Sequence, residues 1–446
     1  MKSDVVIVGA GIAGLTTGAL LAHAGLRVTI LERGNRIGGR ANAHEDKGFV
    51  LNYGAHAMYR PDSGLLAEVM RRLGRTSPPC SYTDPAKAYW ADGERWGSLS
   101  ARPHQALASG LFPLASKARL GPLMLALRTA NPQKIPAGQR WGEWLDARTP
   151  DLPLRRFMRA FATINSYSAR PDDLTARGVV RHIKENIFVR DHAGYMHGGW
   201  KVLFDALVEA IEERGGTIVT GARVRWLEER HGRIEAAVTE DGRYEAGSFV
   251  LTLPPQDAPA LVHEPSPLGR ELARWASMQD VRAVALDLGF SRRVRTDLTL
   301  AFDIERELYY SLHSEVAPGL APHGAQLLHC LAYLTPEDAA SDTAVERRYQ
   351  ELLAGLDRFF PGWRDSVVIE RTMKNVRVTG ARRTPEQYAP GGVPLRPESA
   401  ANLYFANDAR DVPHFLSLAS LASALEVASV LPGELAARPA SAVAVA

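Results

Sequence analysis

The sequence predicts an α/β protein with two domains, and three observations support this fold class. The β-branched run Val5–Val8 is followed by glycines at positions 9, 11 and 14, which is typical of a buried parallel strand that turns sharply into a helix. The chain has 446 residues, more than one hydrophobic core usually contains. Residues 268–393 contain strand-like runs and one amphipathic helix, as expected for a separate α+β domain.

The first strand, turn and helix fit a phosphate-binding unit. Gly9 allows the tight turn, Gly11 lets a pyrophosphate approach the backbone, and Gly14 lets the helix of residues 12–24 pack closely. The N-terminal N–H groups of that helix point at the turn. Glu32 ends the second strand, where its carboxylate can bind ribose hydroxyls and repel the extra phosphate of NADP. The predicted contacts of this Rossmann-like unit are Gly9, Gly11, Ala13, Gly14, Glu32 and Arg33. The alternative is a βαβ unit that binds nothing.

A second group of glycines follows the predicted ribose acid. Gly38-Gly39-Arg40 comes soon after Glu32, and the turn of residues 48–56 follows. At these residues the sequence resembles the superfamily of FAD-containing amine oxidases, protoporphyrinogen oxidases and phytoene desaturases, and it looks closest to the phytoene desaturase branch. The resemblance implies an FAD cofactor, bound non-covalently because no cysteine lies near the C-terminal flavin motif. It adds the predicted contacts Gly38, Gly39, Arg40, Gly54, Ala55 and His56.

Two later stretches resemble the same superfamily. Val224 matches a valine whose backbone contacts adenine, and Asp408 matches an acid that holds the ribityl–phosphate end of the flavin. Asn407 replaces the glycine that usually precedes this acid, and His414 and Leu418 stand where the desaturase branch often has Gly and Asp. These departures leave open a flavin-bearing protein with an assembly role and no chemistry.

The resemblance divides the chain into interleaved segments. A discontinuous, Rossmann-like FAD-binding domain would be assembled from residues 1–60, 194–260 and 396–431. A substrate domain of α+β type would contain the helical segment 61–193 and the segment 261–395. Residues 432–446 are rich in small side chains and are expected to form a disordered tail.

The expected chemistry is transfer of a hydride from a substrate C–H bond to FAD. Amine oxidases of the superfamily carry a lysine near flavin N5, whereas the corresponding stretch here, residues 279–284, has none. Their paired aromatic cage is also not evident in residues 402–418. We therefore predict an oxidoreductase that oxidises, and in particular desaturates, a largely apolar small molecule. A flavin amine oxidase and a protoporphyrinogen oxidase-like enzyme remain alternatives.

The sequence identifies no catalytic residue. His56 and His197 could move protons at neutral pH, but histidines in such turns commonly have structural roles. No second G-x-G-x-x-G follows a strand, so the electron acceptor is expected to be oxygen, a quinone or a diffusing carrier.

Charge and cysteine content indicate which partners and which cellular compartment to expect. The net charge of +3 gives no indication of a nucleic-acid partner, and the two cysteines form neither a disulfide framework nor a metal cluster. They are typical of a reducing, cytoplasmic setting. The first strand begins within four residues, which leaves no room for a signal peptide. No apolar run of about eighteen residues is apparent, so no membrane span is expected. Composition does not predict the oligomeric state.

Residues 105–130 are apolar with scattered basic side chains and allow two interpretations. They could pack as helices inside the substrate domain, or they could form a basic amphipathic surface that rests on a membrane. Pro113 and Pro122 should interrupt any long helix, which favours the first interpretation.

Overall fold

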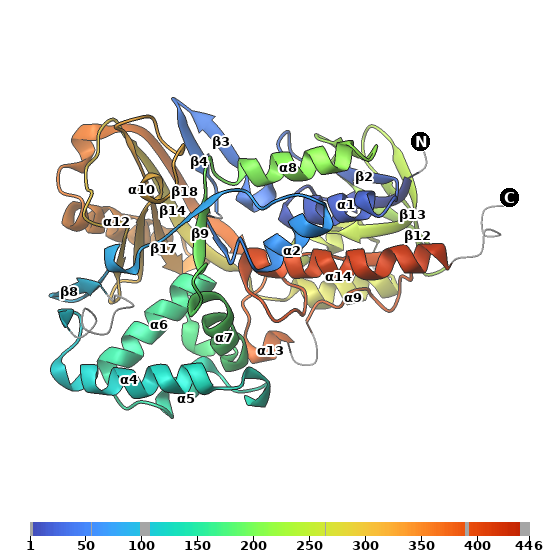
Figure 1. Ribbon diagram of the computed structural model, residues 1–446. Coiled ribbons are helices and arrows are strands. Elements are labelled where there is room, and N and C mark those ends of the chain that lie inside the picture. Colours follow the sequence, from blue (N-terminus) through green and yellow to red (C-terminus); the bar gives the residue numbers. More distant parts are fainter. Residues whose placement is uncertain (1–2, 55, 99–107, 264, 389–391, 438–446) are drawn as a thin grey trace, which may run out of the picture.

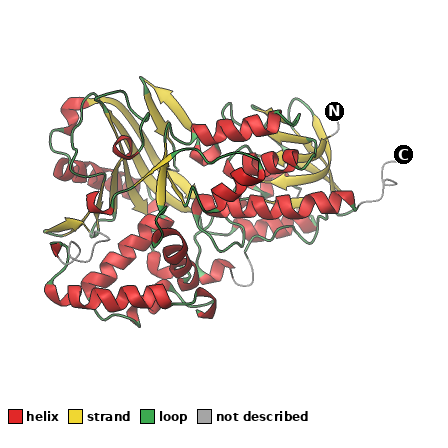
Figure 2. Ribbon diagram, in the orientation of Figure 1, coloured by secondary structure: helices red, strands yellow, loops and turns green. Residues whose placement is uncertain are grey.

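The computed structural model describes residues 3–54, 56–98, 108–263, 265–388 and 392–437. Two lobes lie side by side in Figure 1, each built around a large sheet. Figure 2 shows that helices cover both sheets and that a purely helical part lies below the second one. The predicted α/β fold class is confirmed.

The first lobe contains a seven-stranded sheet whose central strands are parallel. Its order is β10-β2-β1-β13-β12-β11, with β19 beside β13. The strands are β1 (Ser3–Val8), β2 (Val28–Leu31), β10 (Thr217–Val219), β11 (Trp226–Arg230), β12 (Arg233–Val238), β13 (Arg243–Leu251) and β19 (Leu403–Phe405). Val5, Val6 and Ile7 are fully buried because β1 lies between parallel neighbours and has helices on its faces. Three separate stretches of chain therefore supply this sheet.

The helices around this sheet also come from distant parts of the sequence. They are α1 (Ile12–His23), α2 (Leu65–Arg72), α8 (Lys201–Glu212), α9 (Pro267–Ala276) and α14 (Leu416–Ala436). In Figure 1, α1 lies between α8 and α14, and its apolar side chains share one core with both helices. Helix α9 packs against the other side of the sheet, where Trp275 meets Phe405 of β19.

The second lobe contains a seven-stranded sheet with the order β18-β14-β17-β16-β15-β7-β8. Its strands are β7 (Ala88–Asp92), β8 (Arg95–Ser98), β14 (Val281–Phe290), β15 (Leu300–Asp303), β16 (Leu308–Leu312), β17 (Gln326–Leu334) and β18 (Val367–Thr379). Successive residues of β14 face opposite sides. Val284 packs with α12 (Asp342–Phe359), whereas Ala283 and Ala285 pack with the helical part.

The helical part consists of α4 (Leu114–Thr129), α5 (Trp141–Asp146), α6 (Leu152–Ser166) and α7 (Ala176–His182). Smaller elements connect the lobes. These are the hairpin β3 (Ala43–Asp46) and β4 (Phe49–Asn52), and the three-stranded sheet of β5 (Ala57–Tyr59), β9 (Ala193–Met196) and β6 (Cys80–Tyr82). The remaining α-helices of the described residues are the short α10 (His313–Val316), α11 (Pro336–Ala339) and α13 (Pro385–Tyr388).

Three expectations from the sequence need correction. Pro122 does not interrupt a helix but lies inside α4, whose Leu123 and Leu127 are buried in the helical part. Helix α14 continues through Pro432 to Ala436, so the expected tail begins inside a helix. Helix α14 is also long and apolar enough to span a membrane, although half of that stretch is buried in the protein. A buried core helix meets the same criteria, which makes this weak evidence for a span.

Candidate cofactor and active site

The turn after β1 leaves a space beside the N-terminus of α1. Gly9 has a φ of +107°, a conformation that L side chains avoid. A Cβ atom at Gly14 would lie 1.9 Å from the Gly9 carbonyl oxygen, so only glycine fits there. A Cβ atom at Gly11 would meet no atom within 4 Å. The close packing is therefore at Gly9 and Gly14, and the open side is at Gly11.

Glu32 is held by the backbone of the same turn. The Ala10 N–H donates to Oε2 and the Gly34 N–H donates to Oε1 of Glu32, each at 2.8 Å. A carboxylate has about four lone-pair sites, so Glu32 keeps capacity for the hydroxyls of a ribose. Its position at the end of β2 is the one that the sequence predicts.

The second glycine pair closes over the first turn. The Gly38 N–H donates to the Ala10 carbonyl at 2.7 Å, and Gly38 forms a parallel bridge with Gly11. A Cβ atom at Gly39 would lie 3.3 Å from the Gly11 Cα atom. The residues that the sequence groups into two motifs therefore line one space.

These residues fit the pyrophosphate of a dinucleotide. No side chain caps the N-terminus of α1, and its first turn contains no acidic residue. The free N–H groups and the positive end of the helix dipole thus face the open side of Gly11. Ala13 is buried in this first turn.

A buried ion pair joins Arg40 to the C-terminal motif. The Arg40 guanidinium donates to both carboxylate oxygens of Asp408, at 2.7 and 2.8 Å. Thr379 Oγ1 and the Gly380 N–H donate to the same carboxylate at 2.6 and 2.9 Å. Burial raises the pKa of Asp408, but the charge of Arg40 and these hydrogen bonds outweigh it and lower the pKa to about 2. Asp408 is therefore an anion at any physiological pH.

The other predicted contacts lie in different surroundings. Val224 is buried in the loop between β10 and β11. Arg33 is largely exposed and lies 3.9 Å from a carboxylate oxygen of Asp257. Asn407 is buried and its side chain bonds backbone groups of Leu253 and Ala409. Ala55 lies outside the described residues. The assignment of all these residues to the cofactor stays a prediction.

The remaining predicted contacts, Gly54 and His56, belong to the turn that follows β4. A Cβ atom at Gly54 would lie 2.9 Å from the Arg40 carbonyl oxygen, so this turn packs directly on the Gly38-Gly39-Arg40 motif. His56 is 5% exposed, and neither of its ring nitrogens has a hydrogen-bond partner among the described residues. The turn therefore connects the cofactor motifs to the buried interior.

Five tyrosines, four of them buried and one, Tyr167, partly buried, lie between the small β5-β9-β6 sheet, the end of α6 and the second large sheet. Burial raises the pKa of every one of them, so all are neutral hydroxyls at neutral pH. The Tyr195 and Tyr309 hydroxyls lie 3.3 Å apart, and the Tyr167 and Tyr333 rings meet edge to face. The set is Tyr59, Tyr167, Tyr195, Tyr309 and Tyr333. The sequence did not reveal it because its members come from five separate elements.

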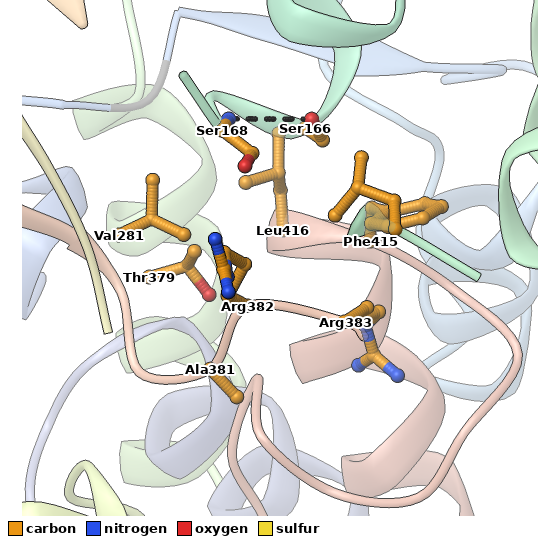
Figure 3. A pocket seen from close by; sticks show the side chains of 10 residues that line it. Ser166, Ser168, Val281, Thr379, Ala381, Arg382, Arg383, Phe415 and Leu416 are labelled. Carbon is orange, nitrogen blue, oxygen red and sulfur yellow. Dashed lines mark hydrogen bonds between the residues drawn. The ribbon is translucent and has the colours of Figure 1, made fainter. Parts of the chain in front are cut away.

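A small cavity lies between the ends of β18 and α6 and the start of α14 (Figure 3). Thr379, which donates to Asp408, lines it together with Arg382, and the start of α14 lies opposite. Phe415 at that helix start packs edge to face on His182, whose pKa burial lowers to about 3. The walls of this region are thus polar near Asp408 and aromatic near α7.

Comparisons with known proteins agree with this arrangement. The sequence pattern of the family described as flavin containing amine oxidoreductase matches residues 12–431. The phytoene dehydrogenase of Streptomyces griseus is 26% identical over 404 residues, which cover 79% of this chain and 78% of that protein. An oxidoreductase from Methanosarcina mazei has a solved structure that superposes with a TM-score of 0.80 at 22% identity, over 97% of this chain and 100% of that one. A putrescine oxidase superposes with a TM-score of 0.72 at 17% identity, over 97% and 99%.

Proposed function

The chain belongs to the family of flavin containing amine oxidoreductases, and on that premise we propose that it oxidises a largely apolar small molecule, by desaturation. FAD is its non-covalent cofactor and accepts a hydride from a substrate C–H bond when bound. Desaturation removes two hydrogens from neighbouring carbons, one as the hydride and one as a proton. The protein must therefore bind an apolar chain, exclude water and align the C–H bond.

The observation that carries this proposal is the neutrality of the aromatic and imidazole side chains that lie between the two lobes. A phenol is neutral at neutral pH, burial raises the pKa of the five tyrosines further, and burial lowers the pKa of His56 and His182. Such surroundings suit an apolar ligand, which gains about 25 cal/mol per Å² of buried apolar surface without a charged anchor. A protonated amine needs a charge partner to offset its desolvation.

The missing lysine points the same way. Within the described strands of the second sheet, Lys374 is the only lysine. Its ammonium group pairs with Glu346 at 2.6 Å on the exposed side of β18, so it does not reach the buried region. Arg282, in the stretch where the sequence comparison expects the lysine, bonds Asp280 and the Asn375 carbonyl instead.

One feature favours the amine oxidase alternative. Burial raises the pKa of Glu307, in the turn between β15 and β16, to about 7, although the charge of Arg348 lowers it. Its charge also acts on the buried phenol of Tyr333. When ionised, this carboxylate could anchor an ammonium group near the tyrosines.

A stopped-flow measurement of flavin absorbance under anaerobic conditions separates the two functions. We expect polyenes to reduce the flavin rapidly and small primary amines to leave it oxidised. The Glu307→Gln variant is the matched control, because an apolar substrate should not detect the lost charge. Rapid reduction by amines, abolished in Glu307→Gln, would reject desaturation and establish amine oxidation. Reduction by porphyrinogens alone would favour the protoporphyrinogen oxidase alternative.

The electron acceptor and the membrane contact stay predictions. Reoxidation of the reduced flavin by oxygen, a quinone or a soluble carrier can be compared in the same instrument.

Leu114 and Leu125 of α4 are 84% and 62% exposed, and residues 105–130 contain three basic and no acidic side chains. Such a face suits an anionic membrane surface. Sedimentation with anionic vesicles should weaken in Leu125→Asp if this contact exists.

A further inference from the structure

A row of polar side chains crosses four neighbouring strands of the second sheet. Arg371 of β18 pairs in register with Asp287 of β14, Asp287 with His329 of β17, and His329 with Ser311 of β16. Directly opposed residues point to the same face. The row is therefore a continuous polar line on an otherwise apolar sheet.

Hydrogen bonds fix the chemistry of this row. His329 Nδ1 lies 2.5 Å from Oδ1 of Asp287, and Arg371 Nε donates to Oδ2 at 2.8 Å. A carboxylate paired with an arginine only accepts hydrogen bonds, so His329 carries a proton on Nδ1. The charges of Asp287 and Arg371 cancel, and all three side chains are nearly or fully buried.

Two further imidazoles contact the His329 ring. The His56 ring centroid lies 3.9 Å from that of His329 and 4.2 Å from that of His313. The His313 and His329 rings are stacked with centroids 5.2 Å apart. His313 is 1% exposed, and its Nε2 atom has no partner among the described residues. We call His56, His313 and His329 the histidine cluster.

The histidine cluster is not arranged as a metal site. The His313 and His329 rings are stacked, and the His56 ring is tilted by 40° and 45° against them. The part of the chain that the structure describes contains no group of three or more His, Cys, Asp or Glu side chains that could hold a metal ion. Another role must explain why three imidazoles are buried together.

The cluster joins the cofactor-side turn to the sheet of the second lobe. Arg371 donates to the Asn52 carbonyl at 2.7 Å and lies over the Tyr53 ring, 4.2 Å from its centroid. The Trp200 indole N–H donates to the His56 carbonyl at 3.2 Å. Asn52 and Tyr53 are thus held from one side and His56 from the other, and Gly54 packs on Arg40, the partner of Asp408.

We propose that the histidine cluster, oriented by the Asp287–Arg371 pair, is a proton-sensitive latch that positions His56 and the segment Asn52–Gly54 and thereby controls how tightly FAD is held. When its imidazoles are neutral, the turn stays stacked on the sheet. When His56 and His313 take up protons, two like charges lie on rings whose centroids are 4.2 Å apart in a buried site, and the turn leaves the sheet. The proposal does not depend on which substrate is oxidised.

Burial gives the latch its pH range. Burial first, and then the neighbouring imidazoles and Arg371, lower the pKa of His56 well below its usual value; burial and His329 do the same for His313. The unlatched turn takes up protons below about pH 6.5, the ordinary histidine pKa, whereas the closed latch does not. The stability of the latch is thus complete above pH 6.5 and is lost as the pH falls below it. Among the described residues, the other titratable or charged groups that contact the cluster or its Asp287–Arg371 pair are Arg371, Asp287, His44, Tyr195 and Tyr309. Cys330 follows His329 on β17 and therefore points to the opposite face of the sheet.

The test is the dissociation constant of FAD from the holoenzyme between pH 8 and pH 5, with circular dichroism to verify that the chain stays folded. We expect a constant value down to about pH 6.5, then an increase of up to about tenfold per pH unit for each proton taken up. The Arg40–Asp408 pair cannot produce this response, because the pKa of Asp408 is about 2. His313→Gln should flatten the increase, because glutamine does not titrate.

The matched control is His197→Gln. His197 is half-buried and bonds Ser81 Oγ at 2.8 Å, away from the cluster, so this variant should keep the wild-type profile. A wild-type profile that is flat to pH 5, or equal profiles for wild type and His313→Gln, would overturn the proposal. If His313→Gln does not fold, hydrogen exchange of Asn52–Gly54 and His56 in the wild type decides instead: exchange should rise below pH 6.5 before the rest of the chain opens, and unchanged exchange would reject the latch.

Discussion

Replacing Asp408 by asparagine tests the ion pair that joins the first and last cofactor motifs. Asn keeps the shape and one acceptor oxygen, but removes the charge that faces Arg40. The lowering of the Asp408 pKa from 3.8 to about 2 corresponds to about 2.5 kcal/mol. Breaking a fully buried pair costs about 3–5 kcal/mol, but Arg40 is one-third exposed and water can solvate part of its charge. We expect the free energy of unfolding to fall by about 2–3 kcal/mol.

Urea unfolding followed by circular dichroism, with the flavin absorbance recorded in parallel, measures this loss. A depressed carboxylate pKa gives stability that is complete above about pH 4 and disappears only as the pH falls towards 2. The difference between wild type and Asp408→Asn should therefore be the same at pH 7 and pH 5. Asp357→Asn is the control, because its Arg364 partner is exposed and such pairs contribute about 0–1 kcal/mol. Equal losses in the two variants, or a difference that shrinks between pH 7 and pH 5, would refute the reasoning.

Three further predictions concern the cofactor. Denaturation with acid should release intact FAD into the supernatant, and flavin that precipitates with the chain would show a covalent bond. Glu32→Ala should weaken FAD binding without unfolding the chain, by about 1.5–3 kcal/mol for each ribose hydrogen bond lost. Equilibrium dialysis measures the affinity for FAD, and an unchanged affinity would show that Glu32 is not part of the site. Gly14→Ala should abolish FAD binding and lower the melting temperature, because the new methyl group would lie 1.9 Å from the Gly9 carbonyl oxygen. The control is Gly121→Ala, which should change FAD binding and the melting temperature little, because a Cβ atom there meets no atom within 4 Å.

The elements that could be predicted from the sequence are those that have a pattern within a short stretch of residues. The strand–turn–helix unit around Gly9 and the acid Glu32 are recognised from the spacing of a short motif. Most strands of the second lobe are recognised from short runs of apolar residues. Strand β18 was not predicted, since its exposed side is rich in charged residues such as Glu370 and Lys374. Because β18 was not predicted, its Arg371, which pairs with Asp287, was not singled out either.

The polar interior could not be predicted for a different reason. His56 and His329 are separated by 273 positions and meet only because two lobes close on each other. No spacing rule connects residues from separate elements, so the sequence singled out His56 but not its partner His329. Asn407 illustrates a third limit: the sequence shows that it replaces a glycine, but only the structure shows that its amide bonds Leu253 and Ala409.

The position of β19 has a consequence for how the protein is made in the cell. The sheet of the first lobe begins with residue 3 but receives β19 only when residues 403–405 have been synthesised, and α1 shares its core with α14, residues 416–436. At about 5–20 residues per second, the ribosome needs on the order of twenty seconds or more to reach them. Until then the nascent chain lacks Asp408 and exposes the apolar face of α1. We therefore expect FAD loading to follow translation, so a chain released before Leu403 should bind no flavin in an ultrafiltration assay.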